Sequence, residues 1–595
     1  MSLIMSRENL DFLLWDWLGT EQLFDRPRFA DHSRETVGAL MEVCEQIATE
    51  HFAPHNRASD LHEPTFDGHT VSVIPEVGRA LRVFGDAGLV AAALPASVGG
   101  GGLPASVTGA CMSWFHAANI GTAGYAMLTL AAANLLAAHG SAEQIDTFVA
   151  PMLEGRWFGT MMLSESQAGS SLADITTRAQ PQEDGSYRLH GRKMWISGGD
   201  HELAENIVHL VLARTPDAPA GTRGISLFIV PKFLLGPDGS LGERNDLVLA
   251  GLNHKMGYRG TVNTAPVLGE GYATPGGRAG AVGYLVGGEH EGLRLMFTMM
   301  NEARIGVGLG ATALGYTAYL KSLAYARERR QGRPLGAAPD AEPVAIVEHP
   351  DVRRMLLAQK AYAEGGLALG LYCARLADDA ASLEGADGSE ANRLLGLLTP
   401  IAKSWPAQWC LAGNELAIQV LGGAGYTRDH DLEQHYRDNR LNMIHEGTHG
   451  IQAMDLLGRK VLLDGGQSLG VLASRVEATC AHAESLGGDG PGLAERLRVA
   501  VDAVASATAA VATLGDQEAM LAEATAYLEA AGHVVVAWLW LSQWCSLGLR
   551  EDAFAEGKRA ATRYFLTREL PKVAAMLDVV RSGDRLTLDL DTTVL

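Results

Sequence analysis

Residues 437–460 have the sequence RDNRLNMIHEGTHGIQAMDLLGRK, and this stretch admits two interpretations. As an H-E-x-x-H motif, His445 and His449 would bind zinc from one helical face, with Glu446 as general base. As a loop that leads into a helix, the stretch would place Glu446 on flexible backbone beside Gly447. We favour the loop, because a zinc site of this kind needs both histidines inside one continuous helix.

A helix is predicted directly after this loop. Ile451, Met454 and Leu457 recur at helical spacing, and the pattern begins only after Gly450. Thr448 stands where a residue that caps the helix N-terminus is expected. The sequence therefore predicts an acid on a loop, followed at once by a capped helix.

The composition limits the possible functions. The 595 residues, 47% of them hydrophobic, indicate two to four globular domains. The formal net charge of -21 disfavours nucleic acids and anionic membranes as partners. Six cysteines occur without a C-x-x-C motif, which is typical of a reduced, intracellular protein.

Neither end of the sequence predicts stable insertion into a membrane. The start, MSLIMSRENLDF, lacks the basic and apolar regions of a secretory signal. The apolar run VVVAWLWL at 534–541 is too short to cross a bilayer and is expected to be a buried helix face. We therefore expect a cytoplasmic protein.

Hydrophobic periodicity divides the chain into four segments and predicts a mostly α fold with a middle β-domain. Two stretches rich in Gly, Ala, Asp and Pro, 332–348 and 378–392, are expected to be surface loops. The predicted segments are an N-terminal helical domain at 1–158, a β-domain at 159–285, a helical bundle at 286–463 and an appended helical domain at 466–595.

Two stretches of the predicted β-domain could bind a polar heterocycle. LSESQAGS at 163–170 and KMWISGG at 193–199 offer hydroxyls and glycine-flanked N–H groups, and an indole could cover a ring face. The alternative is that both are ordinary strand-to-turn junctions with a tryptophan in the core.

Two glycine-rich stretches of the predicted bundle have different expected roles, one in helix packing and one in phosphate binding. The run at 306–310 lacks the G-x-G-x-x-G spacing and follows a helical pattern, so it is expected to allow close helix packing. The run LGGAGY at 421–426 lies between two helical segments and is the better candidate for binding phosphate.

Taken together and in order, six motifs resemble the acyl-CoA dehydrogenase family over residues of about 40 to 463. The appended C-terminal segment resembles a long bacterial branch of that family. The motifs are LSESQAGS, KMWISGGD, MNEARIG, YARERRQGR, QVLGGAGYTRDHDLEQHYRD and IHEGTHGIQ.

The resemblance implies an N-terminal helical domain, a β-barrel-like domain and a C-terminal four-helix bundle, with FAD as cofactor. It implies dehydrogenation of an acyl-CoA thioester to the trans-2-enoyl-CoA, with an electron-transfer flavoprotein as electron acceptor. Glu446 matches the catalytic base, which removes the α-proton while a hydride goes to the flavin. The implied pathway is fatty-acid β-oxidation, and the appended domain favours a homodimer.

The resemblance also implies binding residues. The positions expected to contact FAD are Leu163, Ser164, Ser170, Trp195, Ser197, Arg329, Gln419, Gly422, Gly423 and Thr448. The positions expected to contact the substrate are Ser170, Asn301, Arg304 and Gly447.

The sequence departs from the family pattern at several positions. Ser171 replaces a frequent aspartate, and His445 replaces the frequent tyrosine before the base. We hypothesise that His445 alters the pocket or the pKa of Glu446. Two alternatives remain at this stage: a DNA-associated alkylation-response flavoprotein of the same fold, which the acidic C-terminal segment disfavours, and the zinc hydrolase.

Overall fold

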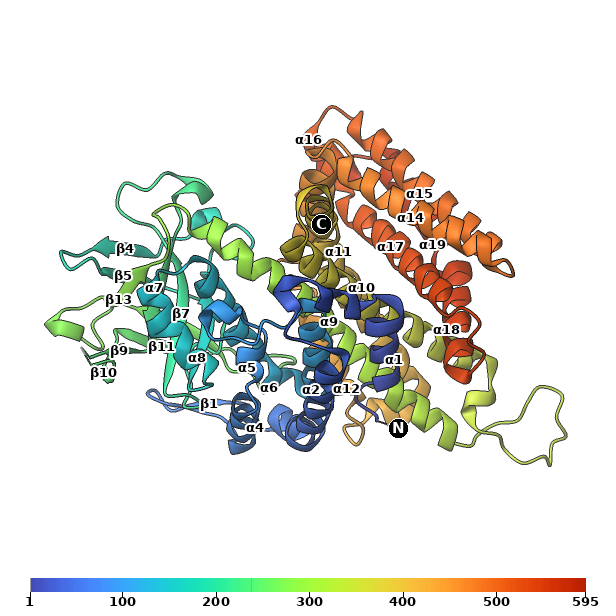
Figure 1. Ribbon diagram of the computed structural model, residues 1–595, viewed down its shortest axis with the longest axis horizontal. Coiled ribbons are helices and arrows are strands. Elements are labelled where there is room, and N and C mark those ends of the chain that lie inside the picture. The colour runs from blue at the N-terminus through green and yellow to red at the C-terminus, as the bar shows by residue number, and fades with distance from the viewer. Residues whose placement is uncertain (1, 237) are drawn as a thin grey trace. The chain divides into compact units, whose positions relative to one another are not determined.

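The computed structural model describes residues 2–236 and 238–595, which form two compact units (Figure 1). The helical unit comprises Met1–Arg34, Ala105–Ser113 and Arg304–Leu595. The β unit comprises Glu35–Pro104 and Trp114–Ala303. The predicted class, mostly helical with a middle β-domain, is confirmed.

The β unit is built on one nine-stranded sheet with the order β11-β12-β5-β13-β8-β7-β3. β4 pairs with β5 and β6 pairs with β12, while β3 and β7 are the parallel neighbours. β7 and β8 are buried along their whole length, as expected of strands covered on both faces. The strands are β3 Trp157–Met162, β4 Arg178–Pro181, β5 Tyr187–Arg192, β6 Ile196–Ser197, β7 Asn206–Ala213, β8 Ser226–Pro231, β11 Leu247–Leu252, β12 Asn263–Leu268 and β13 Ala281–Leu285.

Short strands and helices complete the β unit. β1 Thr65–Phe66 pairs with β2 Val71–Ser72, and β9 Phe233–Leu235 pairs with β10 Leu241–Arg244. The glycine-rich loop at 94–104 folds tightly, since a Cβ on Gly100 would lie 2.1 Å from the Leu94 carbonyl oxygen. The helices before the sheet are α2 Arg34–Ile47, α3 Asn56–Leu61, α4 Pro75–Asp86, α5 Leu89–Ala92, α6 Ala105–His139, α7 Ala142–Gln144 and α8 Ala150–Leu153.

The helical unit contains the long bundle helices and the appended segment. Glycine allows close packing where expected: a Cβ on Gly308 of α9 would lie 1.9 Å from the Ala402 carbonyl oxygen of α11. The bundle helices are α9 Gly292–Glu328, α10 Pro350–Ser382, α11 Gly385–Leu421, α12 Leu432–Leu441, α13 His449–Met454 and the π-helical η13 Asp455–Leu462. The appended helices are α14 Gln467–Leu486, α15 Gly490–Ala512, α16 Gln517–Ala522, α17 Ala524–Ser546, α18 Ala553–Tyr564, α19 Lys572–Ser582 and α20 Leu586–Asp589.

α17 lies among the other appended helices and carries the apolar run noted in the sequence (Figure 1). The run is buried, as predicted for a core helix. By length and composition alone, α6 and α17 could each cross a membrane, but 78% and 83% of their apolar windows are buried. That burial is typical of core helices, so the two helices are weak evidence for a membrane.

The prediction of a surface loop at 378–392 is wrong. Residues 378–392 are helical except for a short break around Leu383, where α10 ends and α11 begins. The alanines and glutamates of this stretch favour helix, and Gly385, with φ of +68°, begins α11 just after the break. Within it, Asp378 is buried at 3% exposure and binds a distant helix end.

A small apolar cavity of about 60 Å³ lies between the bundle and the appended helices, beside Leu397, Leu472 and Val534. It is much smaller than the roughly 150 Å³ of an engineered cavity that binds benzene. We therefore regard it as a packing gap, too small for an acyl chain.

The first helices of the chain form a strap that packs against the appended domain. This N-terminal strap, residues 7–29, consists of α1 Arg7–Asp11 and the short η1 Phe12–Trp17, η2 Thr20–Asp25 and η3 Pro27–Phe29. Trp17 Nε1 donates to Ser542 Oγ of α17 at 2.9 Å, and the Phe12 ring lies 5.4 Å from that of Phe554 in α18. The strap therefore belongs with the appended domain, although the sequence grouped it with residues 35–158.

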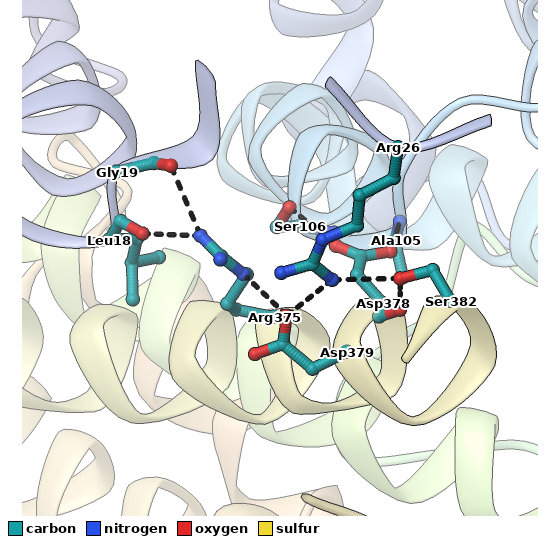
Figure 2. A network of polar contacts seen from close by, with 9 residues as sticks. All are labelled: Leu18, Gly19, Arg26, Ala105, Ser106, Arg375, Asp378, Asp379 and Ser382. Atoms are coloured by element: carbon teal, nitrogen blue, oxygen red, sulfur yellow. Dashed lines mark hydrogen bonds and ion pairs between the residues drawn. The ribbon is translucent and has the colours of Figure 1, made fainter. Parts of the chain in front are cut away.

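Polar contacts fasten the strap to the end of α10 (Figure 2). Arg375 donates to the carbonyl oxygens of Leu18 and Gly19, and Arg26 donates to Asp379 Oδ1 at 2.7 Å. Both arginine side chains are largely buried at this contact. Hydrogen bonds to charged groups are worth about 1.5–3 kcal/mol each, so they hold the strap in place.

The neighbouring Asp378 caps the start of α6. Its carboxylate accepts from Ala105 N at 2.6 Å, from Ser106 N at 3.0 Å and from Ser106 Oγ at 2.6 Å (Figure 2). Burial raises the pKa of this carboxyl to about 6, although these hydrogen bonds oppose the shift.

We expect Arg375→Met to loosen the strap. The substitution keeps an unbranched side chain of similar length and removes the donors to Leu18 and Gly19, together with the ion pair to Asp379 in the same helix. Amide hydrogen exchange in residues 7–29 should become at least about tenfold faster, since each lost charged hydrogen bond is worth about 1.5–3 kcal/mol. Arg354→Met, an exposed change on the same helix, is the control. Equal exchange in the two variants would contradict the role of Arg375.

Candidate active site

The two predicted flavin segments of the β unit lie side by side. Met194 N donates to the Ser164 carbonyl oxygen at 3.0 Å, and Lys193 Nζ donates to the Leu163 carbonyl oxygen at 3.1 Å. These two hydrogen bonds show that the segments are neighbours in the fold, which sequence spacing alone could not reveal.

A buried ion pair that the sequence did not predict locks the segments together. Lys193 Nζ lies 3.0 Å from Glu165 Oε1, and both side chains are at most 2% exposed. Burial would raise the pKa of Glu165, but Lys193 and the hydroxyls of Thr176 and Thr177 outweigh burial and lower it to about 2. Burial lowers the pKa of Lys193 to about 8. The pair is internal, and its role is to hold the loop that carries Leu163 and Ser164.

Trp195 stands out beside this pair. Its backbone has φ of +64°, rare for a bulky residue, and 61% of the residue is exposed. Ser197, two residues later in the chain, is fixed by two hydrogen bonds: Asn263 Nδ2 donates to Ser197 Oγ at 3.2 Å, and Thr160 Oγ1 donates to the Ser197 carbonyl oxygen at 2.6 Å. An exposed indole on fixed backbone fits a flat aromatic ligand, and exposed Ser170 adds a hydroxyl.

In the helical unit, Glu446 lies on a left-handed turn before α13. Its φ is +54° and that of Gly447 is +87°. Thr448 caps α13, as predicted, by accepting from Ile451 N at 3.4 Å. His445 thus lies before the helix that begins at His449, and the two histidines share no continuous helix. The geometry does not support the zinc interpretation.

The surroundings of Glu446 favour a carboxyl that can act as a base near neutral pH. The side chain is half-buried. Burial raises its pKa to about 6, while Lys403 and Arg304 act in the opposite direction. A carboxylate with a raised pKa holds a proton more tightly than an exposed one, so it is a stronger base.

Arg304, predicted to contact the substrate, is buried at 5% exposure and donates to Asp455 Oδ2 at 3.0 Å. Lys403, which the sequence did not predict, is fully buried and donates to the Gly447 carbonyl oxygen at 2.7 Å. The only sequence signal for Lys403 was a lysine within an apolar helical run.

A chain of buried amides supports His445. His445 Nε2 lies 2.9 Å from Asn442 Oδ1, Asn442 Nδ2 donates to Asn439 Oδ1 at 3.0 Å, and Asn439 Nδ2 donates to Asn414 Oδ1 at 2.6 Å. Burial lowers the pKa of His445 to about 3. The imidazole is therefore neutral at working pH, so an effect of its charge on Glu446 is disfavoured.

The remaining predicted residues are exposed. Arg329 and Gln419 lie at the ends of α9 and α11, where Ala326, Val420 and Leu421 share one apolar cluster. Gly422 and Gly423 begin η12, Gly422–Tyr426, where Gly422 has φ of +60° and keeps the backbone open. Asn301 is exposed in the β unit. Arg329, Gln419, Gly422 and Gly423 thus form one exposed group, while contacts to FAD or CoA remain predictions.

Four family models match the chain. Residues 34–156, 160–268 and 290–462 match the N-terminal, middle and C-terminal domains of acyl-CoA dehydrogenase. Residues 472–591 match the model described as "Acetyl-CoA dehydrogenase C-terminal like". The matches follow the order expected from the sequence, including the appended segment.

Known proteins of similar length agree with this result. The chain is 39% identical over 514 residues to 3-methylmercaptopropionyl-CoA dehydrogenase of Ruegeria pomeroyi, covering 86% of this chain and 85% of the relative. It is 32% identical to the broad-specificity linear acyl-CoA dehydrogenase FadE5 of Mycobacterium tuberculosis, covering 98% and 97%. The structure of Caenorhabditis elegans ACDH-11 with C11-CoA has a TM-score of 0.74 at 18% identity, covering 99% of this chain and 95% of that chain. The resemblance expected from the sequence is confirmed.

We expect Asn439→Ala to destabilise the helical unit. The side-chain amides of Asn414 and Asn442 and the Ala311 carbonyl oxygen would each lose a hydrogen bond, at roughly 1–3 kcal/mol for each group left unsatisfied. The free energy of unfolding should fall by at least about 2 kcal/mol, measured by thermal and denaturant unfolding. Asn392→Ala, on α11, is the control. Matching unfolding curves for the two variants would show that the amide chain contributes nothing.

Proposed function

The chain belongs to the acyl-CoA dehydrogenase family, and on that premise we propose that Glu446 is the base that removes the substrate α-proton. The enzyme is an FAD-dependent oxidoreductase that acts on acyl-CoA thioesters, and we propose a trans-2-enoyl-CoA product. The observation that carries the proposal is the half-buried Glu446, whose raised pKa suits a base and whose left-handed turn holds it just before the capped helix.

The chain's residues fit the cofactor. FAD, when bound, supplies the acceptor for the hydride from the β-carbon. The exposed Trp195 on fixed backbone, with Ser164 and Ser197 anchored beside it, suits a flat polar ring. We propose that Leu163, Ser164, Ser170, Trp195, Ser197 and Thr448 bind this cofactor.

The backbone beside the base suits the thioester. An α-proton is too weakly acidic for a carboxylate unless the carbonyl oxygen is polarised by fixed donors. Among the described residues the Glu446 N–H meets no backbone or side-chain acceptor, so it can donate to a substrate oxygen. We propose that Glu446 N–H does so, with Gly447, Ser170, Asn301 and Arg304 as further contacts to the substrate.

We propose a homodimer with an electron-transfer flavoprotein as electron acceptor. The exposed group Arg329, Gln419, Gly422 and Gly423 supports the dimer, because a guanidinium and open backbone suit the pyrophosphate of FAD held by a second copy. The expected role in β-oxidation and the cytoplasmic location belong to the same proposal.

Glu446→Gln should keep the yellow colour and lose the reaction. The amide has the same shape but cannot take up the proton, so anaerobic flavin bleaching by acyl-CoA should slow by about 10²–10⁴-fold. A panel containing 3-methylmercaptopropionyl-CoA and linear acyl-CoAs of several lengths would also identify the preferred substrate. Glu495→Gln, an exposed change on α15, is the control. Bleaching of Glu446→Gln at the parent rate would remove Glu446 from the mechanism.

The rate of that bleaching should depend on pH in a defined direction. The base must be ionised, and the pKa of Glu446 is raised to about 6. The single-turnover rate should therefore be constant above about pH 7 and fall about tenfold per unit below pH 6. Measurement with saturating substrate from pH 5 to 8 tests this, and a midpoint near pH 4.5 would show that burial leaves the acid unperturbed.

A further inference from the structure

Lys403 is a buried cation in an uncommon setting. Its side chain is fully buried in α11, yet no carboxylate of the described chain lies within ion-pair distance of it. Its hydrogen bond goes to the Gly447 carbonyl oxygen, at 2.7 Å. A buried lysine without an ion pair is unfavourable for folding, so a functional reason for its presence is worth seeking.

The turn that Lys403 contacts needs support. Glu446 is not glycine, so its φ of +54° is unfavourable, and such conformations persist where the surroundings fix them. Two buried side chains donate hydrogen bonds to the carbonyl oxygens of this turn. Lys403 Nζ donates to the Gly447 oxygen at 2.7 Å, and Gln452 Nε2 donates to the Glu446 oxygen at 2.9 Å.

Lys403 is itself rigidly placed. Its neighbour Ala402 lies against Gly308 of α9 so closely that a Cβ on that glycine would be 1.9 Å from the Ala402 carbonyl oxygen. This close contact between the two helix backbones sets the position of α11 beside α9, and with it the position of the Lys403 ammonium at the turn.

Apart from Lys403, the basic groups near Glu446 are either paired with a carboxylate or neutral. Arg304 is paired with Asp455, and burial lowers the pKa of His445 to about 3, so the imidazole is neutral. Burial lowers the pKa of Lys403 to about 7, while the Glu446 carboxylate opposes that shift. Below pH 7 Lys403 is thus charged, in the range where Glu446 titrates. The groups around the turn are Lys403 of α11, Arg304 of α9, Asp455 and Arg459 of η13, His445, and His449 with Glu529 of α17.

We propose that Lys403 is the positioning residue of the catalytic turn. Its ammonium holds the Gly447 carbonyl group and thereby the left-handed Glu446 backbone, and its charge favours the ionised carboxylate that accepts the α-proton. The inference rests on the proposed role of Glu446. No bond to Lys403 forms or breaks in the reaction.

The test compares Lys403→Met, Lys403→Gln and Lys403→Arg as FAD-loaded enzymes. Methionine removes the charge and the donor, glutamine keeps a donor without charge, and arginine keeps the charge. In Lys403→Met, single-turnover bleaching at pH 7 should slow at least tenfold, and its acidic midpoint should rise by about one pH unit. Amide exchange of residues 444–450 should become faster, a readout that does not depend on activity. Lys403→Arg should keep the midpoint near that of the parent.

The control is Lys558→Met, which removes an equally buried lysine of the helical unit, paired with Glu364 at 2.9 Å. It should lower the melting temperature without moving the midpoint or the exchange of residues 444–450. If Lys403→Met does not take up FAD, the acidic midpoint is measured in Lys403→Gln instead. An unchanged midpoint and unchanged exchange in the loaded variant overturn the proposal. An active Glu446→Gln enzyme would instead overturn the proposed function.

Discussion

The hydrogen bond from the buried Lys403 to the Gly447 carbonyl oxygen is the contact on which the candidate site depends. It joins a rigid bundle helix to a turn whose backbone is unfavourable by itself. Gln452 holds the preceding carbonyl group from the helix that follows the turn. These contacts hold the backbone of Glu446 in one conformation, whereas the backbone of an ordinary loop would move. Proton transfer requires the acid and its partner to be held in a fixed geometry.

The same use of buried polar groups recurs through the helical unit. Glu364 of α10 pairs with Lys360 in the same helix and with Lys558 of α18. The Lys558 ammonium also lies 5.3 Å from the centre of the Phe12 ring in the N-terminal strap. Three segments far apart in the chain, α10, α18 and the strap, thus meet at the Lys558 ammonium. Removing one partner of a buried ion pair leaves an uncompensated charge, so the pair between Glu364 and Lys558 ties the appended domain to the bundle.

Periodicity was a sound guide to the elements. The middle β-domain, the helix across the glycines at 306–310 and the cap at Thr448 were all predictable from local pattern. The pattern failed at 378–392, because glycine and aspartate suggest a loop when counted singly. There, Asp378 is retained in a helix by the partners it finds at Ala105 and Ser106.

The sequence by itself determined the family, the order of the domains and the acid expected to act as base, because these depend on motifs that are contiguous in the chain. The tertiary structure decided which distant side chains support that acid. Lys403 lies 44 positions before Gly447, and Asn414 lies 25 positions before Asn439, so no local spacing predicts that these residues meet. Their approach follows from helix packing, in which a single glycine such as Gly308 sets how near two backbones can come.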